Sequence, residues 1–174
     1  MKTTITFLML FVSATLIAQD NLKTLEKDNF SVNYPENWFS SDQKPQPSVL
    51  FLISAPENSQ LKDQFRESVN MVIETLPSKT IALEEYTKLS LDQIKSQVPN
   101  LEVNSSKNST LNGLNSRELI WSADFGNGMF LKFKQVFIII ENIAYVITYT
   151  ATTIDYEEYQ KSADKIINSV KFIK

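Results

Sequence analysis

The stretch that most constrains the fold is residues 114–153, where apolar and polar side chains alternate through three successive segments. Within residues 129–139 nearly every odd position is apolar, and within 136–140 the even positions become apolar too. A period of two is the spacing of side chains on one face of a β-strand. The pairs Asn127-Gly128 and Glu141-Asn142 separate the segments, and Asn-Gly is a strong hairpin signal. The stretch predicts a three-stranded antiparallel meander at the centre of a sheet that is covered on both faces.

Shorter patterns predict further strands around this meander. The strands are expected over residues 21–28 (at an edge), 30–34, 49–53 (central), 69–74 and 101–110. Proline-containing polar segments at residues 40–48 and 56–66 are predicted to be loops, the second of them mobile.

Two segments have the spacing of amphipathic helices. Apolar side chains recur at helical intervals over residues 83–98 and 155–170, and Asp155 with Glu158 has the spacing of a capping box. The tail, residues 171–173, is expected to pack back on the sheet. A length of 174 residues favours one domain. The chain is therefore predicted to be an α+β protein, an α/β/α sandwich with a central antiparallel sheet flanked by helices.

The absence of histidine and cysteine narrows the possible chemistry. The chain has neither residue, so it cannot form a Ser-His-Asp triad, a cysteine nucleophile, or a histidine- or thiolate-ligated metal site. We expect no catalytic residues, no cofactor and no metal. The formal charge is −3, with no basic patch, so nucleic acid is not an expected partner. The sequence leaves the oligomeric state open.

Residues 1–18 have the pattern of a cleavable signal peptide. Lys2 is followed by an uncharged, largely apolar run over residues 5–18, too short to span a membrane as a mature helix. The alternative is a buried N-terminal helix. We expect a single mature domain over residues 19–174, secreted or periplasmic, without a membrane span and with its new N-terminus near Gln19 or Asp20.

A few aromatic and basic residues are candidates for a partner surface. Trp38 follows a turn, and it either faces a ligand or plugs the end of the core. The large surface area that a Trp side chain buries favours the second alternative. Phe125 lies at a hairpin tip, and Phe130 shares a strand face with Lys132 and Lys134. An aromatic beside lysines suits an acidic or amphipathic partner, unless both phenylalanines fold down onto a helix.

The chain resembles the PsbP/Mog1-like superfamily. The similarity lies in F-x-V-x-Y-P-x-x-W at Phe30 to Trp38, the helix near Leu83, the long meander, and Y-x-x-x-A-x-x-I-x-x-S-V-K-F at Tyr159 to Phe172. The resemblance implies an α/β/α sandwich with a central antiparallel sheet. It also implies a mostly non-enzymatic role, since members include extrinsic photosystem II subunits, a nuclear binder of the GTPase Ran, and many bacterial exported proteins.

The sequence therefore favours an exported, non-enzymatic binding or assembly module whose partner is another exported or envelope protein. Two alternatives stay open. A carrier of an apolar small molecule would need an apolar cavity between sheet and helix. A carboxylate-based envelope hydrolase would need two acidic side chains converging in one pocket.

Overall fold

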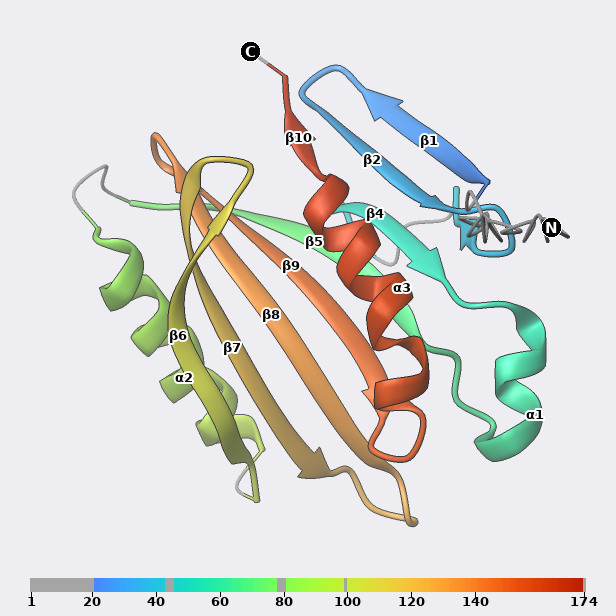
Figure 1. The fold of residues 1–174 in the computed structure, drawn as a ribbon. Helices are drawn as coiled ribbons and strands as arrows, with labels where there is room; N and C mark the ends of the chain where they lie inside the picture. The colour runs from blue at the N-terminus through green and yellow to red at the C-terminus, as the bar shows by residue number, and fades with distance from the viewer. Residues whose placement is uncertain (1–20, 43–45, 78–80, 99, 174) are drawn as a thin grey trace, which may run out of the picture.

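Two antiparallel sheets and two long helices make up the computed structural model, which describes residues 21–42, 46–77, 81–98 and 100–173 (Figure 1). The larger sheet has seven strands in the order β3-β4-β5-β9-β8-β7-β6. Its strands are β3 (Phe39–Ser40), β4 (Val49–Ser54), β5 (Ser68–Thr75), β6 (Glu102–Leu111), β7 (Leu114–Asp124), β8 (Phe130–Ile140) and β9 (Ile143–Thr152). The smaller sheet is β1 (Leu22–Lys27), β2 (Phe30–Pro35) and β10 (Lys171–Phe172), in the order β1-β2-β10.

The predicted meander is confirmed as β7-β8-β9. Val136 of β8 lies opposite Glu118 of β7 and Ile147 of β9, so all three strands share one register. The turn before β7 places Asn112 and Gly113 at positive φ (49° and 84°), where Asn and Gly are the residues best tolerated. The α+β class predicted from the sequence is confirmed.

One face of the large sheet packs against helix α3 (Tyr156–Ser169) and the smaller sheet (Figure 1). Even-numbered residues of β8 and odd-numbered residues of β9 point to this side, and Val136, Ile138 and Tyr149 are buried there. The predicted return of the tail is also observed. β10 pairs with β2 of the smaller sheet, and the Phe172 ring meets Tyr145 of the large sheet with centroids 4.6 Å apart.

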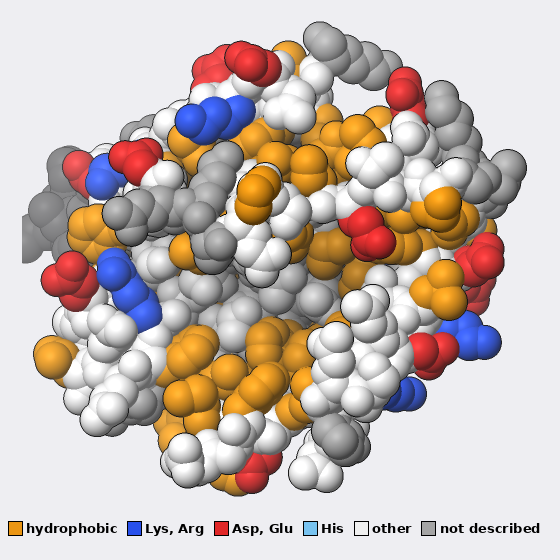
Figure 2. Space-filling model, turned by 180° about the vertical axis from the view of Figure 1, so that it is seen from behind, with side chains coloured by type: hydrophobic (Ala, Val, Ile, Leu, Met, Phe, Trp, Pro, Cys, Tyr) orange, Lys and Arg blue, Asp and Glu red, His pale blue; other side chains and the backbone are white. Residues whose placement is uncertain are grey.

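The other face carries helix α2 (Leu83–Gln97), which packs against β7 and β8, and the buried cluster on this side includes Leu119, Phe137 and, from β9, Ala144. Both faces are therefore covered at the meander, as predicted. This cover is partial beside β5 and β9, where a groove of about 420 Å³ runs along α2 and is lined mainly by glutamine, hydroxyl and apolar side chains. Figure 2 shows this side of the molecule hollowed at its centre, with hydrophobic side chains below the hollow.

Three local predictions are wrong. Residues 56–66 are not wholly a loop, because they contain a 3-10 turn (Glu57–Ser59) and the short helix α1 (Gln60–Asp63). The two-residue strand β3, which the loop prediction missed, forms the edge of the sheet, so the segment at 49–53 (β4) is an inner strand one place from that edge. Its side chains are buried in alternation, on one face only. The side chain of Asp155 makes no capping hydrogen bond, although this residue is the N-cap of α3.

The predicted signal peptide, residues 1–18, lies outside the described residues. None of the helices that the structure describes has the length and apolar character that a membrane span requires.

Candidate functional site

The hairpin between β7 and β8 ends in a tight, well-bonded turn. Gly126, Asn127 and Gly128 all have positive φ (87°, 56° and 78°), a region that Gly adopts without steric cost. Asp124 Oδ1 accepts a hydrogen bond from the Gly126 N–H at 2.8 Å, and the Phe125 N–H donates to the Met129 carbonyl at 2.9 Å. These bonds fix the directions of the residues on both sides of the turn.

Apolar side chains are exposed around this turn. We name the set of four the tip patch; its members and their exposed fractions are Phe125 47%, Met129 42%, Phe130 50% and Ile154 84%. Ile154 comes from the loop between β9 and α3, which lies next to the hairpin because the Thr153 N–H donates to the Phe130 carbonyl at 2.9 Å. Exposed apolar residues that gather in one place are a common mark of an interaction site.

The tip patch presents apolar groups on both sides of the hairpin. Phe125 rests on Phe133, with ring centroids 5.8 Å apart, and Phe133 stacks on Trp121 at 3.9 Å on the α2 side. Phe130 points to the α3 side, because it pairs with Asp124 and side chains alternate along a strand. The two phenylalanines therefore share the tip but face opposite sides of the sheet, which their positions in the sequence did not reveal.

Trp38 is only 2% exposed, so it lies in the core and not on an open surface. Its ring meets Tyr159 of α3 edge to face, with centroids 6.3 Å apart. This buried position is the one expected if Trp38 plugs the end of the core, and Trp38 takes no part in the tip patch.

The two lysines of the predicted surface are already engaged. Lys132 Nζ lies 4.0 Å from the centre of the Tyr156 ring and 3.3 Å from Glu157 Oε1. Lys134, with a side chain 13% exposed, points between the sheet and α3, where its Nζ is 2.8 Å from Asp164 Oδ1 and 3.1 Å from Glu118 Oε2. Only Lys132 therefore borders the tip patch with part of its charge accessible.

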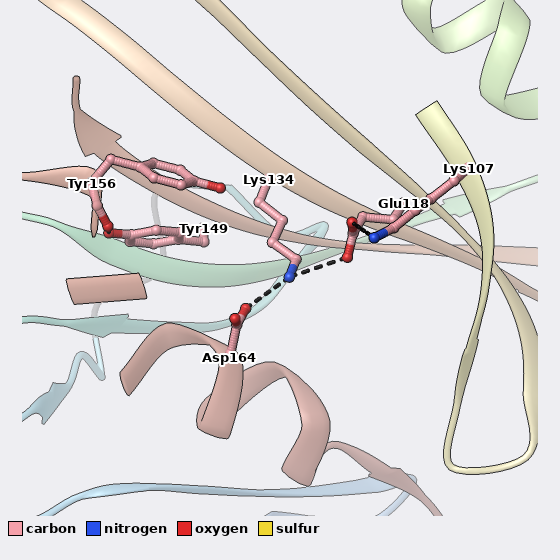
Figure 3. Close-up of polar contacts among 6 residues, drawn as sticks. All are labelled: Lys107, Glu118, Lys134, Tyr149, Tyr156 and Asp164. Atoms are coloured by element: carbon pink, nitrogen blue, oxygen red, sulfur yellow. Dashed lines mark hydrogen bonds and ion pairs between the residues drawn. The ribbon is translucent and has the colours of Figure 1, made fainter. Parts of the chain in front are cut away.

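Lys134 belongs to a chain of four alternating charges that we name the charge network (Figure 3). It runs from Lys107 through Glu118 and Lys134 to Asp164, and the Lys107–Glu118 distance is 3.0 Å. Burial alone would raise the pKa of Glu118, but hydrogen bonds and charge from both lysines outweigh it and lower the pKa. Burial alone would lower the pKa of Lys134, but Asp164 and Glu118 outweigh it and raise the pKa.

Two buried tyrosines lie beside the charge network (Figure 3). The Tyr149 hydroxyl donates to the Tyr156 carbonyl at 2.8 Å, which ties the first turn of α3 to β9. Burial, aided by nearby carboxylates, raises the pKa of both phenols, so they stay neutral at physiological pH. Neither tyrosine is a general base under these conditions, and both serve the docking of α3.

Sequence reasoning placed Phe125, Phe130 and Lys132 near one another and missed Met129 and Ile154. The period of two assigns Met129 to the apolar face of the strand over residues 129–139, but Met129 precedes β8 and lies on the turn. Ile154 lies between a predicted strand and a predicted helix, where an isolated apolar residue carries no periodic signal. Within the described ranges no cluster of three acidic side chains could hold a metal ion.

Comparisons with known proteins agree with this architecture. A family model described as PsbP-like protein matches residues 15–172, whereas no curated protein matches the chain. The solution structure of cyanobacterial PsbP (CyanoP) from Synechocystis sp. PCC 6803 superposes with a TM-score of 0.65 at 13% identity, covering 92% of this chain and 98% of that one. LpqN of Mycobacterium tuberculosis, described as involved in cell envelope biogenesis, superposes with a TM-score of 0.68 at 12% identity, covering 90% and 91%.

A third structure, the protein PA94 of unknown function from Pseudomonas aeruginosa, a putative regulator, has a TM-score of 0.56 at 14% identity and covers 85% of this chain and 94% of that one. At these identities the likeness shows a shared fold.

Proposed function

Because the chain belongs to the PsbP-like protein family, we propose that it is an exported, non-enzymatic binding module that docks on another envelope or exported protein through the tip patch. The observation that carries this proposal is the exposure of Phe125, Met129, Phe130 and Ile154 at one end of the large sheet. Aromatic side chains held on a rigid element lose little entropy on binding and often dominate the energy of an interface.

The surroundings of the tip patch favour an amphipathic partner. Lys132 already pairs with Glu157 and lies over the Tyr156 ring, so it can offer only part of its charge to an acidic group of a partner. Asp124 is exposed on the same hairpin, next to Phe125. Apolar contact therefore supplies most of the binding energy, and the flanking charges of both signs supply orientation.

The proposal does not include catalysis, because the two neighbouring carboxylates, Glu118 and Asp164, are held in an ion-pair network. Glu118 and Asp164 approach each other, yet both bind the same ammonium of Lys134, at 3.1 and 2.8 Å. A hydrolytic carboxylate pair would instead flank an open site and differ in pKa, one being raised. The pKa of Glu118 is lowered, which suits a permanent anion in an ion pair.

Export is part of the same proposal and rests on the leader pattern in residues 1–18. One solved relative by fold, LpqN, is described as involved in cell envelope biogenesis, and this is compatible with an envelope location for the present chain.

Site-specific photocrosslinking tests the proposal. A photoreactive phenylalanine analogue is placed at Phe125, and in a matched protein at Leu89, an exposed apolar residue on α2. We expect the Phe125 probe to crosslink a discrete envelope protein in the native host and the Leu89 probe not to. The Phe125→Ser/Phe130→Ser variant should lose capture of that protein, while Leu89→Ser should retain it.

Both serine variants must first show wild-type unfolding in urea, so that lost capture is not lost folding. If the tip variant captures the same protein as the wild type, or if both probes crosslink it equally, the tip patch is not the docking site.

A further inference from the structure

A pocket lies at the opposite end of the large sheet from the tip patch. A pocket of about 460 Å³ opens where β10 approaches the β6–β7 and β8–β9 turns, at the upper end of Figure 1. Its walls come from both sheets, since Leu114, Ile140 and Tyr145 belong to the large one and Phe172 to the small one. The sequence analysis expected a carrier's cavity between sheet and helix, whereas this one lies between the two sheets.

The walls of the pocket are mostly apolar. Leu114, Ile140 and Phe172 are partly buried at the margin of the main core, and Ile173 stands at the rim, 42% exposed. The Phe172 and Tyr145 rings meet at 61° and 4.6 Å, which forms a firm aromatic corner. An apolar ligand placed here would remove these surfaces from water, the main favourable term in binding.

Two polar groups that line the pocket have no hydrogen bond or ion pair with the residues that the structure describes. Tyr145 is only 8% exposed, yet its hydroxyl makes no hydrogen bond with the described residues. Burial and the charge of Glu141 raise the pKa of Tyr145, so this hydroxyl remains a neutral donor. Lys171 lines the same pocket, and its ammonium makes no ion pair within the described part of the chain. Both groups can donate a hydrogen bond, and one is positively charged.

We infer that this pocket binds a small amphiphilic carboxylate, with its apolar body between the two sheets and its anionic head at Lys171 and Tyr145. The volume is at the lower end of the range of about 300–1,000 Å³ for small-molecule sites, which favours a medium-chain or aromatic acid over a whole phospholipid. The side-chain amide nitrogen of Asn112, at the rim, is already engaged, because it donates to the Asn168 and Val170 carbonyls.

The experiment uses decanoate as the anionic probe and decanol as its neutral counterpart, each below the concentration at which it aggregates. Binding to the purified protein is followed by amide chemical shifts in nuclear magnetic resonance. We expect decanoate to bind saturably, with the largest shifts in residues 112–114, 140–145 and 171–173. We expect decanol to bind more weakly at the same place.

Two variants with a matched control separate the roles of the polar groups. Lys171→Gln should weaken decanoate about fivefold and leave decanol unchanged, the size expected of one exposed ion pair. Tyr145→Phe keeps the ring but removes the donor, and should also weaken decanoate about fivefold. Lys88→Gln, an exposed lysine of α2, should change neither affinity.

Three results would overturn the inference. These are shifts that map to another surface, shifts that never saturate, and a Lys171→Gln protein that binds decanoate as the wild type does. Urea unfolding of each variant distinguishes lost binding from lost structure, and the pocket variants lie far enough from the tip patch that the proposed docking function is tested separately.

Discussion

Replacing Lys134 with methionine should destabilise the protein by about 2–3 kcal/mol, a magnitude set by what the charge network leaves behind. Methionine keeps most of the apolar stem of the side chain but removes the ammonium that binds Glu118 and Asp164. Asp164, 31% exposed, can recover water, whereas Glu118, 10% exposed, keeps only the outer lysine Lys107. Most of the lost stability therefore comes from Glu118, which stays ionised but keeps only one of its two lysine partners.

Urea unfolding at pH 7 measures this cost, with Lys88→Met on the surface of α2 as the control for the loss of one positive charge. The double variant Lys134→Met/Glu118→Gln should be more stable than Lys134→Met alone, because the poorly compensated charge is gone. A loss below about 0.5 kcal/mol for Lys134→Met, the scale of an exposed pair, would show that the network is solvated and would refute the reasoning.

The charge network also predicts how the difference in unfolding free energy between wild type and Lys134→Met depends on pH. The folded pKa of Glu118 is lowered from the ordinary 4.5, so its contribution is present above that value and is lost as pH falls through the folded pKa. The folded pKa of Lys134 is raised from 10.5, so its contribution is full below that value and is lost only as pH rises through the folded pKa. The gap between wild type and Lys134→Met should therefore be constant from about pH 5 to 10 and shrink toward pH 3.

Two further predictions concern the core and the N-terminus. Ile138→Ala, at a fully buried position on the α3 side, should cost about 2–5 kcal/mol in urea unfolding. Ile139→Ala should cost less, because Ile139 is only partly buried beneath α2. A wild-type midpoint for Ile138→Ala would mean that the α3 face is open. Mass spectrometry of the protein from its native host should find a new N-terminus near Gln19 or Asp20, and an intact Met1 in the cytoplasm would rule out export.

The parts of the fold that sequence reasoning predicted are those with long, consistent periodicity. β7, β8 and β9 are ten or eleven residues long and have apolar side chains at a period of two, and α2 and α3 carry clear apolar stripes. The failures involve short elements. β3 has two residues and α1 has four, too few to show any period, and β3 depends on its pairing with a distant segment, as between Phe39 and Ser54.

The candidate site was predictable only in part, for a related reason. The Asn127-Gly128 signal located the hairpin and hence Phe125 and Phe130, but it could not show which residues of another loop lie beside them. Ile154 joins the tip patch through a hydrogen bond between β8 and the residue after β9. The pocket beside β10 depends on how the C-terminal residues return to β2, and pairing between strands more than a hundred residues apart leaves no local signal in the sequence.

The two surfaces lie at opposite ends of one strand, and this follows from how the meander is packed. Phe130 begins β8 and Ile140 ends it, so ten steps of about 3.4 Å separate the tip patch from the pocket by about 34 Å. Between them, Val136, Phe137 and Ile138 are buried, and a change there would be felt first as lost stability. Strand ends carry no such constraint, because their side chains meet turns and solvent. A sheet covered on both faces of its central strands thus leaves its two ends as the places where the proposed docking and the proposed ligand binding meet the least cost in stability.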